Sequence, residues 1–187
     1  MIILSLVLIL IWFLSEFTGS YLIPGIRFPK TNYKNKDRGS GFLITADVIV
    51  SVLVSLIFLH YNILIIHFPV VYAGLSLFFA GIIIRQSSVY TLGTYFSLHI
   101  RALEHHKIIK KGLYKYIRHP QYLGIILSTI GFSTTFGSMP AILLTLIITG
   151  WVFHYRMNVE EDFLKNKLGK DYEDYIGKTK RIIPYLY

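Results

Sequence analysis

The sequence predicts an all-α integral membrane protein: a helical bundle of about five transmembrane helices with a cytoplasmic amphipathic helix near the C-terminus. Composition is the first reason, because 53% of the 187 residues are apolar and 16% are charged, against about 25% charged in soluble domains. The second reason is patterning. The apolar residues fall in long runs separated by short basic segments, as expected of helices that cross a hydrocarbon core about 30 Å thick.

Each predicted span is a run of mostly apolar residues. The five runs cover roughly residues 1–22, 42–66, 68–95, 121–136 and 139–155. The first run has no charged leader and no small-residue cleavage signal before Glu16, so we expect it to be retained as a span. We treat residues 1–187 as one membrane domain, in which 1–95 hold three spans and 96–187 hold the functional residues.

Basic residues are expected to mark the cytoplasmic side. All Lys and Arg except Arg85 lie in the first loop, the third loop or the C-terminal tail, whereas the connections near His60–His67 and Phe136–Pro140 contain none. The positive-inside rule then places the N-terminus outside and the tail in the cytoplasm. The net charge of +9 therefore follows from topology and from contact with anionic membrane lipids, and we expect no nucleic acid partner.

Arg85 lies inside the third apolar run, where an unpaired charge is costly. The sequence leaves three solutions open for it. Its side chain extends to the interface, or pairs with Asp47, or pairs with Glu16.

The fourth and fifth runs are predicted to form a tight helical hairpin. Gly124, Ser128 and Gly131 recur at helical spacing, and such small residues allow two membrane helices to approach closely. Pro140 suits the first turn of the returning helix.

Beyond Arg156 the chain becomes charged, while apolar residues recur at helical spacing from Phe163 to Leu168, just before Gly169. This pattern predicts a separate amphipathic helix along the cytoplasmic face. A second short helical piece is expected over residues 171–176.

The densest polar and aromatic cluster lies where the third loop enters the fourth run. Pro120 disfavours helical geometry at His119 and is well placed in the first turn of the next helix, so His119 is expected at a helix start. Backbone N–H groups there would suit an anion. Because the hairpin is antiparallel, His119 and Tyr122 at its base should lie near Arg156 and Glu160.

Three motifs in this region occur in a fixed order. They are G-x-Y at 112–114, R-H-P-x-Y-x-G at 118–124 and R-x-x-x-E-E at 156–161. The ordered set resembles the isoprenylcysteine carboxyl methyltransferase and phospholipid methyltransferase group over roughly residues 93–184, and it is similar in size and hydropathy to the small prokaryotic members. The resemblance implies a membrane methyltransferase that binds S-adenosylmethionine on the cytosolic side.

The resemblance also implies roles for individual residues. It places cofactor contacts at His106, Lys107, Ile108, Ile109, Tyr114, His119, Pro120, Gln121, Tyr122 and Glu160. It makes Arg156 the substrate-facing residue, and we take Arg156 and Glu160 as the candidate catalytic pair. His99, His105 and His106 lack the companion ligands of a zinc signature, so we expect no metal.

The implied reaction moves a methyl group to a lipid-soluble acceptor, most like that of a protein-S-isoprenylcysteine O-methyltransferase. The acceptor stays open among a prenylcysteine carboxylate, a phospholipid amine, an isoprenoid and a small thiol. A carboxylate is already ionised at neutral pH, whereas an amine would need a base such as Glu161 or His119. Two other functions also stay open: an NADPH-dependent membrane sterol-type reductase, which shares a similar R-H-P-x-Y-x-G segment, and a non-catalytic membrane binding protein.

Overall fold

The computed structural model describes residues 2–19, 39–64, 70–98, 100 and 107–187. Its helices are α1 (Ile2–Phe17), α3 (Ser40–His60), α4 (Val70–Leu92), α5 (Pro120–Thr135), α6 (Met139–Leu168) and α7 (Lys170–Lys178), with 3-10 turns η2 (Gly93–Tyr95) and η3 (Gly112–Lys115). An isolated bridge joins Ile117 and Lys180. The described part of the chain is therefore all-α, as predicted.

Among the described residues, three helices are long and apolar enough to cross a membrane: α3, α4 and α6. Helices α1 and α5 have 16 residues each, or about 24 Å at 1.5 Å per residue, which is shorter than a hydrocarbon core. The integral membrane class is thus supported by helix length and composition. The count of five spans and the side on which each terminus lies stay predictions.

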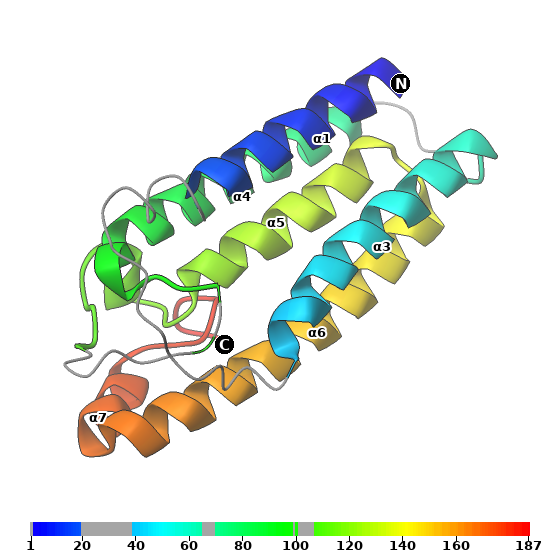
Figure 1. Ribbon diagram of the computed structural model, residues 1–187. Coiled ribbons are helices and arrows are strands. Elements are labelled where there is room, and N and C mark those ends of the chain that lie inside the picture. Colours follow the sequence, from blue (N-terminus) through cyan, green and yellow to red (C-terminus); the bar gives the residue numbers. More distant parts are fainter. Residues whose placement is uncertain (1, 20–38, 65–69, 99, 101–106) are drawn as a thin grey trace.

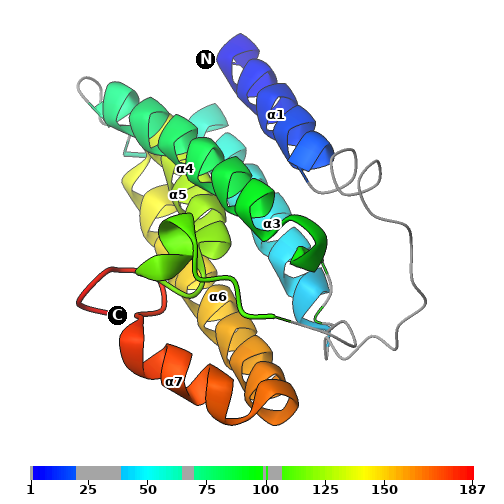
Figure 2. The ribbon, with the colours of Figure 1, turned by 90° about the vertical axis from the view of Figure 1, so that its left-hand side faces the viewer.

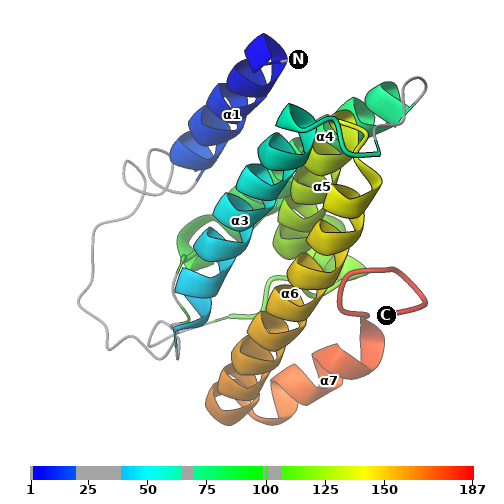
Figure 3. The same ribbon diagram turned by 90° about the vertical axis from the view of Figure 1, so that its right-hand side faces the viewer.

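The helices form a bundle with α5 at its centre. In Figure 1, α4 and α1 lie on one side of α5, and α3 and α6 lie on the other. Helix α1 runs along the edge of the bundle, far from α6 (Figures 2 and 3). The last turns of α4 and α6, the first turn of α5, α7 and the C-terminal tail all gather at one end of the bundle, and this end carries the predicted functional residues.

The small-residue stripe of α5 faces α4, so the prediction that it faces α6 was wrong. A Cβ added to Gly131 would lie 2.3 Å from the backbone nitrogen of Phe78, and one added to Gly124 would lie 2.6 Å from that of Arg85. Helix α4 contributes its own Gly81, which packs against Ser128 of α5. Glycines on both helices allow their backbones to approach closely, which stabilises helix pairs in lipid through van der Waals packing.

Aromatic side chains fill the space between α1, α4 and α5. Trp12 of α1 meets Phe78 of α4 edge to face with ring centroids 5.7 Å apart, and Phe132 of α5 lies 6.0 Å from Trp12. Phe78 and Phe132 are fully buried. This cluster attaches the edge helix α1 to the centre of the bundle.

Helix α6 continues without a break beyond Arg156, so the predicted separate amphipathic helix was wrong. Its 30 residues extend about 45 Å, and the last turns therefore project beyond a hydrocarbon core. No Gly or Pro lies between Gly150 and Gly169 to end the helix. Gly169 adopts a φ of +55°, which suits glycine, and there the chain turns back into α7 (Figure 2).

Candidate active site

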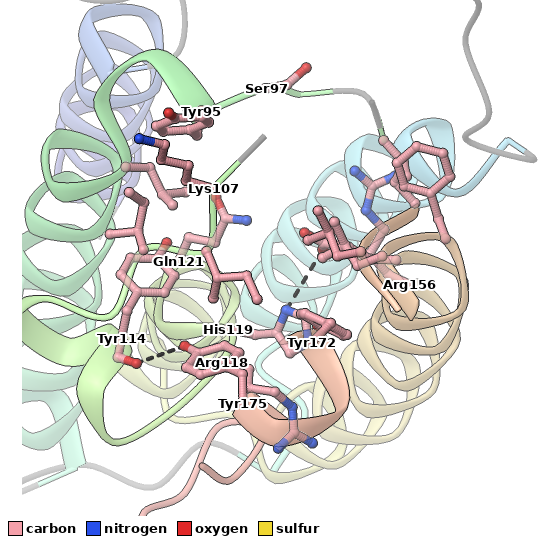
Figure 4. A pocket seen from close by; sticks show the side chains of 18 residues that line it. Tyr95, Ser97, Lys107, Tyr114, Arg118, His119, Gln121, Arg156, Tyr172 and Tyr175 are labelled. Atoms are coloured by element: carbon pink, nitrogen blue, oxygen red, sulfur yellow. Dashed lines mark hydrogen bonds and ion pairs between the residues drawn. The ribbon is translucent and has the colours of Figure 1, made fainter. Parts of the chain in front are cut away.

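A pocket opens at the end of the bundle where α4, α5, α6 and α7 meet (Figure 4). The space free of protein atoms amounts to about 750 Å³, a figure that includes open solvent at the mouth of the pocket. The predicted site residues that line it are Lys107, Ile108, Ile109, Tyr114, His119, Gln121, Arg156 and Glu160.

Two predicted residues do not line the pocket. Tyr122 lies behind the wall and contacts Glu160 from there, and Pro120 is buried in the first turn of α5. His106 falls outside the described residues.

A hydrogen-bonded row joins α5 to α6 beside the pocket. Arg156 Nε donates to the Tyr122 hydroxyl over 2.9 Å, and that hydroxyl donates to Glu160 Oε2 over 2.5 Å. The predicted proximity of the two helix bases is therefore confirmed. The phenol is well suited to this place because it accepts from a cation while donating to a carboxylate.

Arg156 is held from three directions although it is only 2% exposed. Besides Tyr122, its NH1 donates to Ser40 Oγ at the start of α3 over 2.7 Å, and its NH2 donates to the Leu98 carbonyl over 3.0 Å. A guanidinium is suited to this position because its planar fork presents donors in fixed directions. The result is a buried positive charge fixed at the pocket wall.

His119 lies between two glutamates. Its ring stacks on Tyr122 with centroids 5.4 Å apart, Nε2 lies 3.1 Å from Glu161 Oε1, and Nδ1 lies 3.7 Å from Glu160 Oε2. As predicted, His119 precedes the first helical residue of α5. Its backbone N–H, however, donates to the carbonyl of Arg181 over 2.9 Å. The C-terminal tail therefore uses a donor that we expected to suit an anion.

Glu161 is an anchor for the chain segments around the pocket. Oε1 accepts from Arg118 Nε over 2.9 Å and Oε2 accepts from Arg181 over 2.9 Å, while His119 contacts Oε1. The Arg118 backbone N–H also donates to the Lys180 carbonyl over 2.7 Å. The sequence did not predict this network, because its members are between 20 and 62 positions apart and share no periodic pattern.

Tyr114 presents a buried hydroxyl at the pocket wall. The residue is 4% exposed, and its hydroxyl has no hydrogen-bond partner within the described residues. Burial raises the pKa of this phenol well above its usual value, with the nearby Glu160 carboxylate adding to the shift. Its turn is held from α7, where the Tyr175 hydroxyl donates to the Tyr114 carbonyl over 2.7 Å. A buried donor without a partner at a pocket wall indicates a place for a polar ligand atom.

Further lining residues were not predicted as site residues. They are Leu92, Tyr95, Ser97, Ile100, Arg118, Phe163, Leu164, Leu168, Tyr172 and Tyr175. Burial raises the pKa of Tyr172 and of Tyr175, the former also through the nearby Glu160 carboxylate, so both phenols stay neutral. The helical spacing of Phe163, Leu164 and Leu168 predicted a helix along the cytoplasmic face, whereas in the structure these residues line the pocket.

Arg85 pairs with Glu16, which was one of the three possibilities. Arg85 Nε lies 3.2 Å from Glu16 Oε1. Asp47, the other acid considered, instead accepts from the Thr149 hydroxyl, whose oxygen lies 3.0 and 3.2 Å from the two carboxylate oxygens, between α3 and α6.

Taken together, the fold and the site define an integral membrane helical protein with a charged ligand pocket at one end of its bundle. Residues 73–166, half of the chain, match the model of the isoprenylcysteine carboxyl methyltransferase (ICMT) family. The chain belongs to that family, as the motifs predicted.

Curated relatives and one solved structure agree with this assignment. The protein-S-isoprenylcysteine O-methyltransferase A of Arabidopsis thaliana is 29% identical over 79% of this chain and 78% of its own length, and its B counterpart is 28% identical over 60% and 58%. The chain thus spans about three fifths of the B relative's length. The structure of a eukaryotic intramembrane Ras methyltransferase, ICMT, is similar in fold with a TM-score of 0.63 at 22% identity, over 76% of this chain and 52% of that one.

Proposed function

We propose that this protein is an S-adenosylmethionine-dependent methyltransferase that methylates the carboxylate of an isoprenylcysteine-type acceptor held in the bilayer. The row Arg156–Tyr122–Glu160 carries the proposal, because it places a fixed cation and a carboxylate side by side at one pocket. The Arg156 guanidinium suits an acceptor carboxylate. The Glu160 carboxylate suits the positive groups of the methyl donor.

The pocket residues fit such a cofactor. The buried Tyr114 hydroxyl is a neutral donor in need of an acceptor atom, and a cofactor of this kind offers hydroxyl, ring nitrogen and carboxylate acceptors. Both described contacts of Glu160 use Oε2, and the other oxygen has no described partner. When bound, S-adenosylmethionine supplies an electrophilic methyl group on a positively charged sulfur. Tyr114, Glu160 and the aromatic wall of Tyr172 and Tyr175 are the residues that we expect to hold it.

Arg156 is assigned the role of orienting the acceptor. Its contacts to Ser40, Tyr122 and the Leu98 carbonyl fix the guanidinium before any acceptor arrives, so little freedom is lost on binding. Arg156 would present an acceptor carboxylate oxygen to the methyl group that bound S-adenosylmethionine would supply, and the bonding electron pair of the carbon–sulfur bond would leave with the sulfur. Because the carboxylate is already ionised, no residue has to remove a proton.

The geometry of Glu161 agrees with a reaction that needs no base. Both of its carboxylate oxygens are engaged, by Arg118 and His119 on one side and by Arg181 on the other. A carboxylate held in this way is a poor proton acceptor, because protonation would break charge-assisted hydrogen bonds. We therefore assign Glu161 a structural role and favour a carboxylate over an amine acceptor.

Cofactor identity is tested by calorimetric titration of the detergent-purified protein. S-adenosylmethionine, S-adenosylhomocysteine and NADPH are titrated in parallel, and we expect saturable binding of the first two alone. Binding of NADPH alone would assign the pocket to a reductase. Binding of none of the three to folded protein would favour a non-catalytic role.

A further inference from the structure

A part-buried ion pair joins α1 to α4 next to the pocket wall. Arg85 of α4 uses Nε and NH2 on the two oxygens of Glu16 of α1, over 3.2 and 3.3 Å, and uses NH1 on Gln121 Oε1 of α5, over 3.3 Å. The Arg85 side chain is 5% exposed and its guanidinium also lies 5.2 Å from the Phe96 ring centroid. Arg85 thus links three helices, and one of its partners, Gln121, lines the pocket.

The contact with Arg85 determines which way the Gln121 amide points. A guanidinium has donors and no acceptor, so only the amide oxygen of Gln121 can face it. The amide NH2 must then point away from Arg85. Because Gln121 is 6% exposed and lines the pocket, these N–H groups are the polar atoms that it can offer to a ligand.

We propose that Arg85, held by Glu16, is a positioning residue that orients the Gln121 amide as a hydrogen-bond donor to an acceptor atom of the adenosyl cofactor. This inference rests on the proposed function, since it names the ligand of the same pocket. It gives α1, which carries none of the motifs, a part in cofactor recognition through Glu16. Arg85 itself does not line the pocket and acts through Gln121.

A neighbouring contact separates this role from helix attachment. Gln86, the next residue of α4, donates its side-chain amide to the Ser15 carbonyl of α1 over 2.8 Å. Gln86→Ala therefore removes a tie between α1 and α4 while leaving the link from Arg85 to Gln121 intact. It is the matched control.

The test is a double-mutant cycle on the affinity for S-adenosylhomocysteine, measured by calorimetry. We expect Arg85→Met and Gln121→Leu each to weaken binding about tenfold, because each should lose the hydrogen bond from the Gln121 amide to the cofactor. The double variant should be no weaker than Gln121→Leu alone, because Arg85 acts through Gln121. Gln86→Ala should bind within about twofold of wild type. Additive losses in the double variant would overturn the proposal.

A second variant keeps the test decisive if Arg85→Met does not fold. Gln121→Glu retains a partner for Arg85 but removes the N–H groups, so we expect it to bind S-adenosylhomocysteine as weakly as Gln121→Leu. Wild-type affinity in Gln121→Glu would refute the donor role. Failure of the wild-type protein to bind the cofactor would instead refute the proposed function, which makes the two failures distinguishable.

Discussion

Arg156 Nε donates a hydrogen bond of 2.9 Å to the hydroxyl of Tyr122, and this contact joins the two helices that carry the candidate site. The Tyr122 hydroxyl in turn donates to Glu160. One phenol therefore connects Arg156, which we assign to the acceptor, with Glu160, which we assign to the cofactor.

Tyr122→Phe removes that phenol oxygen and keeps the ring. Hydrogen bonds to charged groups contribute about 1.5–3 kcal/mol, so we expect kcat/KM for methyl transfer to fall about 10- to 100-fold. Tyr116→Phe is the matched control, because Tyr116 is 50% exposed and lies outside the row. Equal activity of the two variants would contradict the role of Tyr122.

Arg156→Ala should abolish turnover and leave cofactor binding largely in place. The guanidinium is assigned to the acceptor, and no other residue of the row can supply its charge. The measurement pairs turnover with calorimetric affinity for S-adenosylhomocysteine, and Lys165→Ala, an exposed position on the same helix, serves as control. If turnover and cofactor affinity were lost together, Arg156 would have a role in cofactor binding or in folding and not in orienting the acceptor.

His119→Ala and Glu160→Gln are expected to show the opposite pattern, with weaker cofactor binding as the first effect. Both side chains line the pocket and lie 3.7 Å apart at Nδ1 and Oε2. Removal of either changes the charge distribution that faces the cofactor. Calorimetry should detect a loss of cofactor affinity of about tenfold or more for each variant. Unchanged affinity in both variants would show that neither residue binds the cofactor.

Glu161→Gln should destabilise the protein more than it changes the chemistry. Removing one member of a buried charge network typically costs about 3–5 kcal/mol, and here Arg118 and Arg181 would lose their shared carboxylate. A clear fall in the thermal unfolding midpoint in detergent is expected, whereas Asp162→Asn, on the exposed neighbour, should leave it unchanged. Equal midpoints would mean that the tail is not held through Glu161.

Stability should decline at alkaline pH because of buried tyrosines. Burial raises the pKa of Tyr114, Tyr172 and Tyr175 in the folded protein, while in the unfolded chain each ionises near pH 10. Above about pH 10 the unfolded state therefore binds fewer protons, and the free energy of unfolding decreases as pH rises. Tyr172→Phe should make this decline shallower, by at most about 1.4 kcal/mol per pH unit. Unfolding midpoints between pH 8 and pH 11 measure the effect, and identical slopes in the two proteins would contradict it.

The sequence predicted the pairing at the base of the hairpin because local signals were sufficient. Pro120 marks the start of α5, and a four-residue spacing places Arg156 and Glu160 on one face of α6. Antiparallel packing then brought Tyr122 to both of them. Helix starts and helical spacing are encoded within a few residues, and both were confirmed.

Other features depended on contacts between distant segments. The helix that packs against the small-residue stripe was predicted wrongly, because small residues indicate a close helix contact but not which helix makes it. In the structure α4 makes this contact, since it has glycines of its own at the interface. The tail that pairs with Arg118 and His119 carries no period or motif. The end of the fifth run at residue 155 reflected a change in polarity, whereas the α6 backbone continues to Leu168.

The proposed chemistry is tested most directly by the product. The purified protein is incubated with S-adenosylmethionine labelled in its methyl group and with a small S-farnesylcysteine that bears a free carboxylate; the matched carboxamide is the control. A carboxyl methyl ester releases its label as methanol in base, whereas an N-methyl product does not. We expect base-labile label on the carboxylate compound alone, and we expect the Arg156→Ala variant to produce no such label. Folded, cofactor-binding protein that labels neither compound would contradict carboxyl methylation.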